Sequence, residues 1–220
     1  MKFYHGSMIE GLTELRPHLP VGAHIQEPLV CLTSSRQLAL HYIWDTERLG
    51  VKMPMIHIRE DGVFVFQEMF PNALEYFYKG VSGYLYHCEG DFTVKQDSYV
   101  PTCVTTGEAV PVTDCEYIEN VYEAILGYAE QGQLIYEHYE ALPQWRKDVI
   151  RGHITRFIKR NNLLNDPAHP SKNFISEKFP EYWAEAKVLS EHDLFRMIMC
   201  RWRARISFLP KVKIGVATSF

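Results

Sequence analysis

The segment Phe3-Tyr-His-Gly-Ser7 holds the residue types whose spacing most favours chemistry. A histidine follows two aromatic residues and precedes a glycine and a hydroxyl group. An imidazole donates or accepts a hydrogen bond near neutral pH, and a glycine lets another molecule approach the backbone closely. Together these residues predict a strand end against which a flat, polar ligand docks.

Short strands and helices must position these side chains. Lys2–His5 and Leu29–Thr33 have the character of strands, and further strands are expected at 53–59, 62–66, 84–88, 92–95 and 108–112. Capping boxes, in which two side chains satisfy backbone donors at a helix start, begin at Ser7, Ser34 and Thr113. They predict a short helix or turn at about 8–15, a helix from 34 to about 47, and helices after 113. Apolar periodicity predicts later helices at 143–162 and 191–208.

The order of these motifs carries a resemblance. Gly11-Leu, Leu15 and Pro17 follow the first segment, and the strand Val30-Cys-Leu-Thr33 comes next. Tyr84-Leu-Tyr-His-Cys-Glu89 and then Thr105-Thr-Gly-Glu-Ala-Val-Pro-Val112 complete the pattern. Over residues 1–113 it resembles the ADP-ribosyltransferase-like family, especially the small bacterial group that includes the rifampin ADP-ribosyltransferases. The resemblance implies an α+β fold, with a split β-sheet domain at 1–113 followed by an all-helical C-terminal region at 114–220.

The resemblance also implies a site for NAD as co-substrate. In that family the histidine holds a ribose hydroxyl, and the backbone of the next glycine binds the nicotinamide amide. By position these roles fall on His5 and Gly6, and the hydroxyl residues of the site are Ser7 and Thr33. His5 also has a plainer interpretation, a histidine hydrogen-bonded at a strand end.

A late carboxylate supports the positive charge that develops as the glycosidic bond of NAD breaks. The resemblance assigns this role to Glu108, with Asp97 as the second choice. A fixed carboxylate in a site with little water stabilises such a charge strongly. Glu108 is equally consistent with a solvated residue at the start of a strand.

One position departs from the family pattern. The second strand often carries a tyrosine that stacks on the nicotinamide, and Cys31 stands there in this chain. Either Tyr42 or Tyr84 supplies the aromatic ring instead, or the chemistry is weakened. The sequence therefore predicts an ADP-ribosyltransferase that uses NAD on an unknown acceptor, a protein or a small molecule. A catalytically inactive domain of the same fold, binding a nucleotide or a protein partner, is the alternative.

Charge is distributed unevenly along the chain. Residues 1–142 hold 8 basic and 20 acidic side chains, a balance of −12, and the remainder holds 15 basic and 7 acidic, a balance of +8. The two halves either attract each other or form separate surfaces. Basic residues at 143–162 and 196–205 suggest RNA binding as a third function, although cationic helical faces are more often simply solvated.

Other features exclude several classes of protein. The five cysteines form no Cys-x-x-Cys pair, so neither a disulfide framework nor a thiolate zinc site is expected. His87, Cys88 and Cys103 lack the spacing of a metal site. Since we find no signal peptide and no membrane-spanning run, we expect a cytoplasmic protein.

Overall fold

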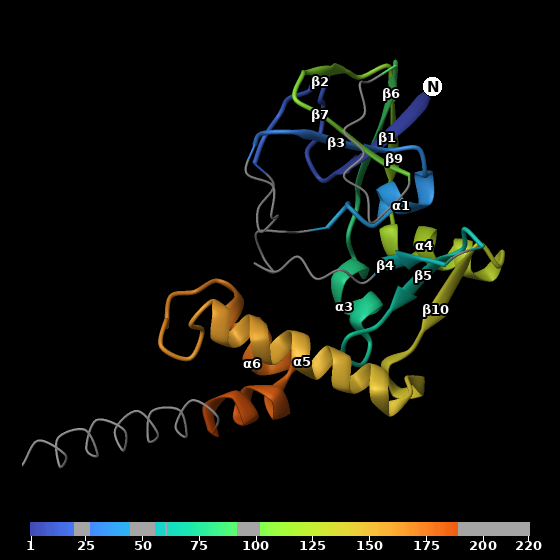
Figure 1. Cartoon of the computed structure of the whole chain (residues 1–220). Coiled ribbons are helices and arrows are strands. Elements are labelled where there is room, and N and C mark those ends of the chain that lie inside the picture. The colour runs from blue at the N-terminus through green and yellow to red at the C-terminus, as the bar shows by residue number, and fades with distance from the viewer. Residues whose placement is uncertain (20–26, 45–55, 60, 92–101, 189–220) are drawn as a thin grey trace, which may run out of the picture.

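The main element of the fold is a five-stranded antiparallel sheet. The computed structural model describes residues 1–19, 27–44, 56–59, 61–91 and 102–188 (Figure 1). The strands lie in the order β7-β3-β1-β6-β9, and every neighbouring pair is antiparallel. Their bounds are β1 Lys2–Ser7, β3 Val30–Thr33, β6 Gly83–Glu89, β7 Cys103–Thr106 and β9 Asp114–Ile118.

Two smaller sheets accompany the main one. In the first, β5 (Phe64–Gln67) lies between β4 (Ile56–Ile58), which is antiparallel to it, and β10 (Leu134–Glu137), which is parallel. In the second, β2 (Glu14–Leu15) pairs with β8 (Val110–Pro111). The chain is therefore a mixed α+β protein in which antiparallel pairing predominates.

The helices lie on one side of the main sheet and below it in Figure 1. They are α1 Arg36–Leu40, α3 Ala73–Tyr78, α4 Val121–Glu130, α5 Gln144–Arg160 and α6 Ser171–Lys178, with a 3₁₀ turn at Tyr139–Ala141. Residues 180–188 are also helical. No helix in the described part of the chain has the length and apolar character needed to cross a bilayer.

Each face of the main sheet packs on its own apolar cluster. One face carries Phe3, Leu32 and Tyr86 and packs with β2 and β8. The opposite face contacts α1, and its cluster continues through α3, α4, β10, α5 and α6. We call this second side the α1 face. Because side chains alternate along a strand, the register of the sheet assigns each residue to one face or the other.

Helix α1 crosses the strands of the sheet. Its first residue, Arg36, bonds to Glu116 of β9, and Ala39 lies against Gly6 of β1. Just past its end, the Tyr42 hydroxyl lies near the thiol of Cys103 in β7. The helix therefore lies over the middle of the sheet, in contact with β3, β1 and β6.

The β structure extends past residue 113. The capping-box spacing at Thr113–Glu116 predicts a helix, and that prediction is wrong, since Asp114–Ile118 form β9 along β6. The helix begins instead at Val121, where the Asn120 side chain accepts a hydrogen bond from the Glu123 N–H. Since β10 follows as well, residues 114–188 are not all helical. Pairing with β6 satisfies the backbone of β9 more completely than a capped turn does.

The capping boxes at Ser7 and Ser34 have different outcomes in the structure. Ser7 accepts a hydrogen bond from the Ile9 N–H at 3.1 Å, which closes a turn, and no helix follows. The helix predicted from 34 begins at Arg36 with Ser35 as its cap, and it ends at Leu40. The expected helix at 191–208 and the strand at 92–95 lie outside the described residues.

Candidate functional site

His5 lies in the middle of β1 and is largely buried. Its Nδ1 is 2.9 Å from the carbonyl oxygen of Cys31. Because a carbonyl only accepts, Nδ1 carries the proton and Nε2 is left as an acceptor. Burial lowers the pKa of His5, the Cys31 hydrogen bond partly offsets this, and nearby His18 lowers the pKa further. His5 is therefore a neutral imidazole with one nitrogen able to accept a hydrogen bond.

The bond from His5 marks the place where β1 and β3 separate. In the described chain these two strands pair only through Tyr4 and Thr33. Beyond that pair, the imidazole of His5 takes the place of a backbone donor to the Cys31 carbonyl. β1 pairs with β6 along its whole length, so the opening is on the β3 side alone.

Gly6 is required by helix α1. A Cβ atom at this position would overlap the carbonyl oxygen of Ala39 and would lie 3.0 Å from Ile43 Cγ1. Glycine does permit a close approach here, as the sequence suggests, but the approaching group is a helix of the same chain. Nothing in this contact requires a ligand.

The predicted site residues divide between the two faces of the sheet. His5 pairs with Tyr86, and Ser7 pairs with Tyr84. His5, Ser7 and Tyr84 therefore lie on the face away from α1. Thr33 is opposite Tyr4 on the α1 face, where Tyr42 also lies. The predicted site residues therefore do not share one face of the sheet.

Thr33 and Tyr42 meet around the thiol of Cys103. Thr33 is buried, its hydroxyl accepts the Ser35 N–H at 3.1 Å, and the Cys103 thiol lies nearby. The Tyr42 hydroxyl lies near the same thiol, while half of the residue's surface stays exposed. Burial raises the pKa of the Tyr42 hydroxyl, and the nearby thiols of Cys103 and Cys31 raise it further. Tyr42 thus brings a partly exposed ring beside the cysteine that stands in the tyrosine position.

Tyr84 belongs to an aromatic cluster on the other face. Its ring centre is 5.2 Å from that of Tyr117 and 6.1 Å from that of Tyr86. The Tyr86 hydroxyl donates to the Ile9 carbonyl at 2.6 Å and accepts the Leu12 N–H at 3.3 Å. This cluster fastens the loop after β1 to the sheet, which is a structural task.

Glu108 lies in the exposed turn between β7 and β8. Its N–H donates to the Thr106 hydroxyl at 3.1 Å. Among the described residues, no hydrogen bond or ion pair joins its carboxylate to His5. The alternative acid, Asp97, lies outside the described residues.

A row of polar side chains that the sequence does not reveal crosses all five strands on the α1 face. The register aligns Cys103, Thr33, Tyr4, His87 and Asp114, one from each strand in sheet order. We call these five residues the polar row. Sequence spacing could not identify it, because the pairing of β6 with β9 decides which residues are neighbours.

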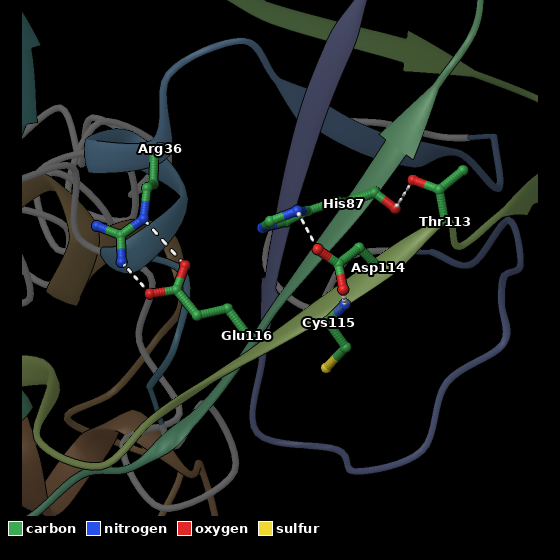
Figure 2. Close-up of polar contacts among 6 residues, drawn as sticks. All are labelled: Arg36, His87, Thr113, Asp114, Cys115 and Glu116. Carbon is green, nitrogen blue, oxygen red and sulfur yellow. Dashed lines mark hydrogen bonds and ion pairs between the residues drawn. The ribbon is translucent and has the colours of Figure 1, made fainter.

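The pair at the end of the polar row is His87 and Asp114 (Figure 2). His87 is 8% exposed, and its Nδ1 is 3.3 Å from Asp114 Oδ2. Neither ring nitrogen makes a hydrogen bond within the protein. The Tyr4 ring meets the imidazole edge-on at 5.2 Å. In the described segments, no three histidine, cysteine, aspartate or glutamate side chains gather as a metal site would require.

Beside this pair, Arg36 joins α1 to β9 and to α4. Its Nε and Nη2 donate to the two carboxylate oxygens of Glu116, and its Nη1 donates to the Tyr128 hydroxyl at 2.9 Å. The Glu116 bond raises the already high pKa of the guanidinium. Because Arg36 is fully engaged, we assign it a structural role.

Comparison with known proteins gives no match. No family model, no curated protein and no solved structure matches this chain. Function must therefore be argued from the arrangement of the residues themselves.

Part of the predicted basic face of α5 is paired within the protein. Arg146 bonds to Glu137 and Gln67, and the Lys147 ammonium lies 5.1 Å from the centre of the Tyr139 ring. Arg151 is 3.6 Å from Glu185. These contacts reduce the positive charge that α5 offers to a phosphate backbone. The second basic segment, 196–205, lies outside the described residues.

The motif Tyr136-Glu-His-Tyr139 surrounds a buried acid. Glu68 is 2% exposed, accepts the Tyr136 hydroxyl, and accepts the Tyr139 N–H at 2.9 Å. His138 Nδ1 is 3.8 Å from the same carboxylate. Both carboxylate oxygens have donors, so the cluster joins β5 to β10 and is fully accounted for by packing.

Proposed function

We propose that this chain is an ADP-ribosyltransferase-like protein that binds NAD at the opening between β1 and β3 and transfers ADP-ribose to an unknown acceptor. The state of His5 is the observation that carries the proposal. Its Nδ1 is engaged by Cys31, and its Nε2 is an acceptor that suits a ribose hydroxyl. Burial keeps the imidazole neutral, as this role requires.

Tyr42 supplies the aromatic ring in place of the family tyrosine. Its side chain lies beside Cys31 and is 50% exposed, so a planar nicotinamide has a face on which to stack. Tyr84 is the poorer candidate, because its ring already packs against Tyr86 and Tyr117. Thr33 and the backbone at Gly6 border the same opening and complete the proposed site.

The reaction needs a carboxylate near the breaking glycosidic bond. Loss of nicotinamide leaves a positively charged ribose centre, which a nearby fixed negative charge stabilises, and holding the acceptor at attack distance supplies the rest. Glu108 is the proposed acid, and Asp97 is its alternative.

A second candidate function keeps NAD binding and lacks the transfer step. Two observations favour it: cysteine stands at position 31, and Glu108 is exposed without a contact to His5 in the described structure. In this version the domain binds a nucleotide or a protein partner without reacting.

Nicotinamide release and NAD binding test both candidates. The purified chain is incubated with NAD, release is followed by chromatography, and binding is measured by calorimetry and by a thermal shift. Release above that of a denatured sample supports the transferase. Binding with intact NAD after long incubation supports the second candidate, and an absence of both removes the NAD proposal.

Variants locate the site. We expect His5→Ala and Tyr42→Leu to weaken NAD binding by about tenfold or more, the loss expected when one hydrogen bond or one stacked ring is removed. His153→Ala is the matched control, since His153 is exposed on α5. Equal loss in all three variants would contradict the proposed location.

RNA binding through α5 is the remaining rival from another class of function. It predicts measurable RNA affinity at low salt that falls steeply as salt is added. The internal pairing of Arg146 and Arg151 argues against it. An absence of binding at 50 mM salt would exclude it.

A further inference from the structure

Two cysteines on neighbouring strands share the α1 face of the main sheet. Cys31 lies in β3 opposite Thr105, and Cys103 lies in β7 opposite Thr33. Because side chains alternate along a strand, Cys31 is on the same face as Thr33, which is the α1 face. Cys103 packs against the apolar cluster of that face. The two thiols therefore lie on one side of the sheet, as diagonal neighbours across the β3–β7 pair.

The spacing of these two positions suits an atom that bridges two sulfurs. Diagonal partners in an antiparallel pair have Cα atoms about 7–8 Å apart, with their Cβ atoms closer. A disulfide needs Cα atoms about 4.4–6.8 Å apart, and the structure holds both residues as thiols. The thiols are nevertheless close enough to interact electrostatically. Two metal–thiolate bonds in line, each about 2.3 Å as for zinc, span roughly 4.6 Å, which diagonal side chains can reach.

The other cysteine pair of the sheet provides a comparison. Cys88 in β6 and Cys115 in β9 are also diagonal neighbours on one face, the face away from α1. Burial raises the pKa of Cys88 to about 11, with no contribution from Cys115. Cys88 is buried and Cys115 is exposed, whereas Cys31 and Cys103 are both partly exposed. Only the pair on the α1 face therefore combines two interacting thiols with access from solvent, among the cysteines in the described segments.

The groups around the thiols decide which ion the pair can hold. In the part of the chain that the structure describes, no three histidine, cysteine, aspartate or glutamate side chains gather, so the four ligands of a structural zinc site are not assembled. Mg²⁺ and Ca²⁺ require several oxygen ligands, chiefly carboxylates, but the neighbours here are the hydroxyl groups of Thr33 and Tyr42. Soft thiolate ligands select Cu(I), which, unlike zinc, is stable with two thiolates in a nearly linear arrangement.

We propose that Cys31 and Cys103 bind one Cu(I) ion between β3 and β7. Each thiol loses its proton as its sulfur bonds to the ion, so two protons are released and the oxidation state of the metal does not change. The inference goes beyond the proposed NAD function and does not depend on it. Because Tyr42 lies beside both thiols, a bound ion would occupy space next to the ring proposed for nicotinamide.

Anaerobic titration with Cu(I), with a chromophoric Cu(I) chelator as competitor, tests the site. We expect the full chain, without NAD, to retain one ion per chain against the chelator. Loss of an outer partner of a metal ligand weakens binding by about 10–100-fold, so loss of a ligand in Cys31→Ser or Cys103→Ser should weaken it by about a hundredfold or more. Cys115→Ser is the matched control and should bind the ion as the unaltered chain does.

Alkylation followed by peptide mapping locates the ion. One equivalent of Cu(I) should protect Cys31 and Cys103 from N-ethylmaleimide and leave exposed Cys115 reactive. The inference is wrong if the chelator removes Cu(I) from the unaltered chain as readily as from the two serine variants. Protection of Cys115 or Cys200 in place of the proposed pair would overturn it as well.

Thermal melts of the metal-free variants check that each one folds. If one serine variant does not fold, the other variant and the protection of the unaltered chain carry the test. The outcome is separate from that of the NAD experiments. A chain that holds Cu(I) and does not bind NAD keeps this inference and removes the proposed function, and the reverse result does the opposite.

Discussion

Replacement of Gly6 by alanine tests whether the helix α1 explains this glycine. The added methyl group would overlap the Ala39 carbonyl oxygen and press on Ile43 Cγ1 at 3.0 Å. Neither side moves easily, because β1 pairs with β6 along its length and the Ala39 carbonyl accepts the Tyr42 N–H at 3.1 Å. Over-packing of this kind costs about 1–3 kcal/mol, and more where backbone must shift. We therefore expect Gly6→Ala to lower the free energy of unfolding by about 3 kcal/mol.

Gly127→Ala is the matched control. Gly127 lies within α4, and a Cβ atom there would meet nothing within 4 Å. Alanine is favoured over glycine in a helix by about 1 kcal/mol, so this variant should be more stable than the unaltered chain. The two variants should differ by roughly 4 kcal/mol in urea unfolding, with the slope of each transition unchanged.

The result that would refute this reasoning is a Gly6→Ala variant within 0.5 kcal/mol of the unaltered chain, taking roughly that value as the effect of a neutral substitution. Such a variant would mean that α1 does not cover β1 as described. If it also failed to bind NAD, the glycine would serve the ligand and not the helix.

Three further predictions concern stability. Burial lowers the pKa of His41 to about 4, below the unfolded value of 6.5. The free energy of unfolding is therefore highest above pH 6.5 and falls by on the order of 3 kcal/mol toward pH 4. In His41→Phe the urea midpoint should depend less on pH over that range. Arg36→Ala and Glu116→Ala should each cost about 1 kcal/mol, since the pair is one-third exposed, and a double-mutant cycle should be non-additive. Tyr136→Phe removes a donor from buried Glu68 and should cost about 1–3 kcal/mol in chemical denaturation.

Local sequence patterns predict where helices and strands lie better than they predict which strands pair. Alternation and capping signals predict the strands that became β1, β3 and β6, and the helix that became α5. The capping box at Thr113 gives a wrong prediction, because side chains that cap a helix also occur in strands. The pairing of β9 with β6 makes this segment a strand. That pairing joins residues 27 or more positions apart, so no local signal reports it.

The candidate site shows the same limit. His5 and Tyr42 are readable from the sequence as site candidates, and the structure brings both to the Cys31 strand. Asp114 belongs to no sequence motif, and only the pairing of β6 with β9 places it opposite His87. The glycine at position 6 predicts a close approach to the backbone, but the sequence does not state that the approaching group is Ala39 of α1.

The crossing of α1 over the sheet limits where a ligand on the α1 face can lie. The helix covers the row that contains Gly6 and Leu85. On one flank Ile43 fills the space over Gly83, where a Cβ atom would also lie 2.7 Å from the Ser7 carbonyl oxygen. On the other flank is the polar row, where hydroxyl, imidazole and carboxylate groups follow one another across the strands. The flank of α1 that carries the polar row is therefore the more polar part of this face.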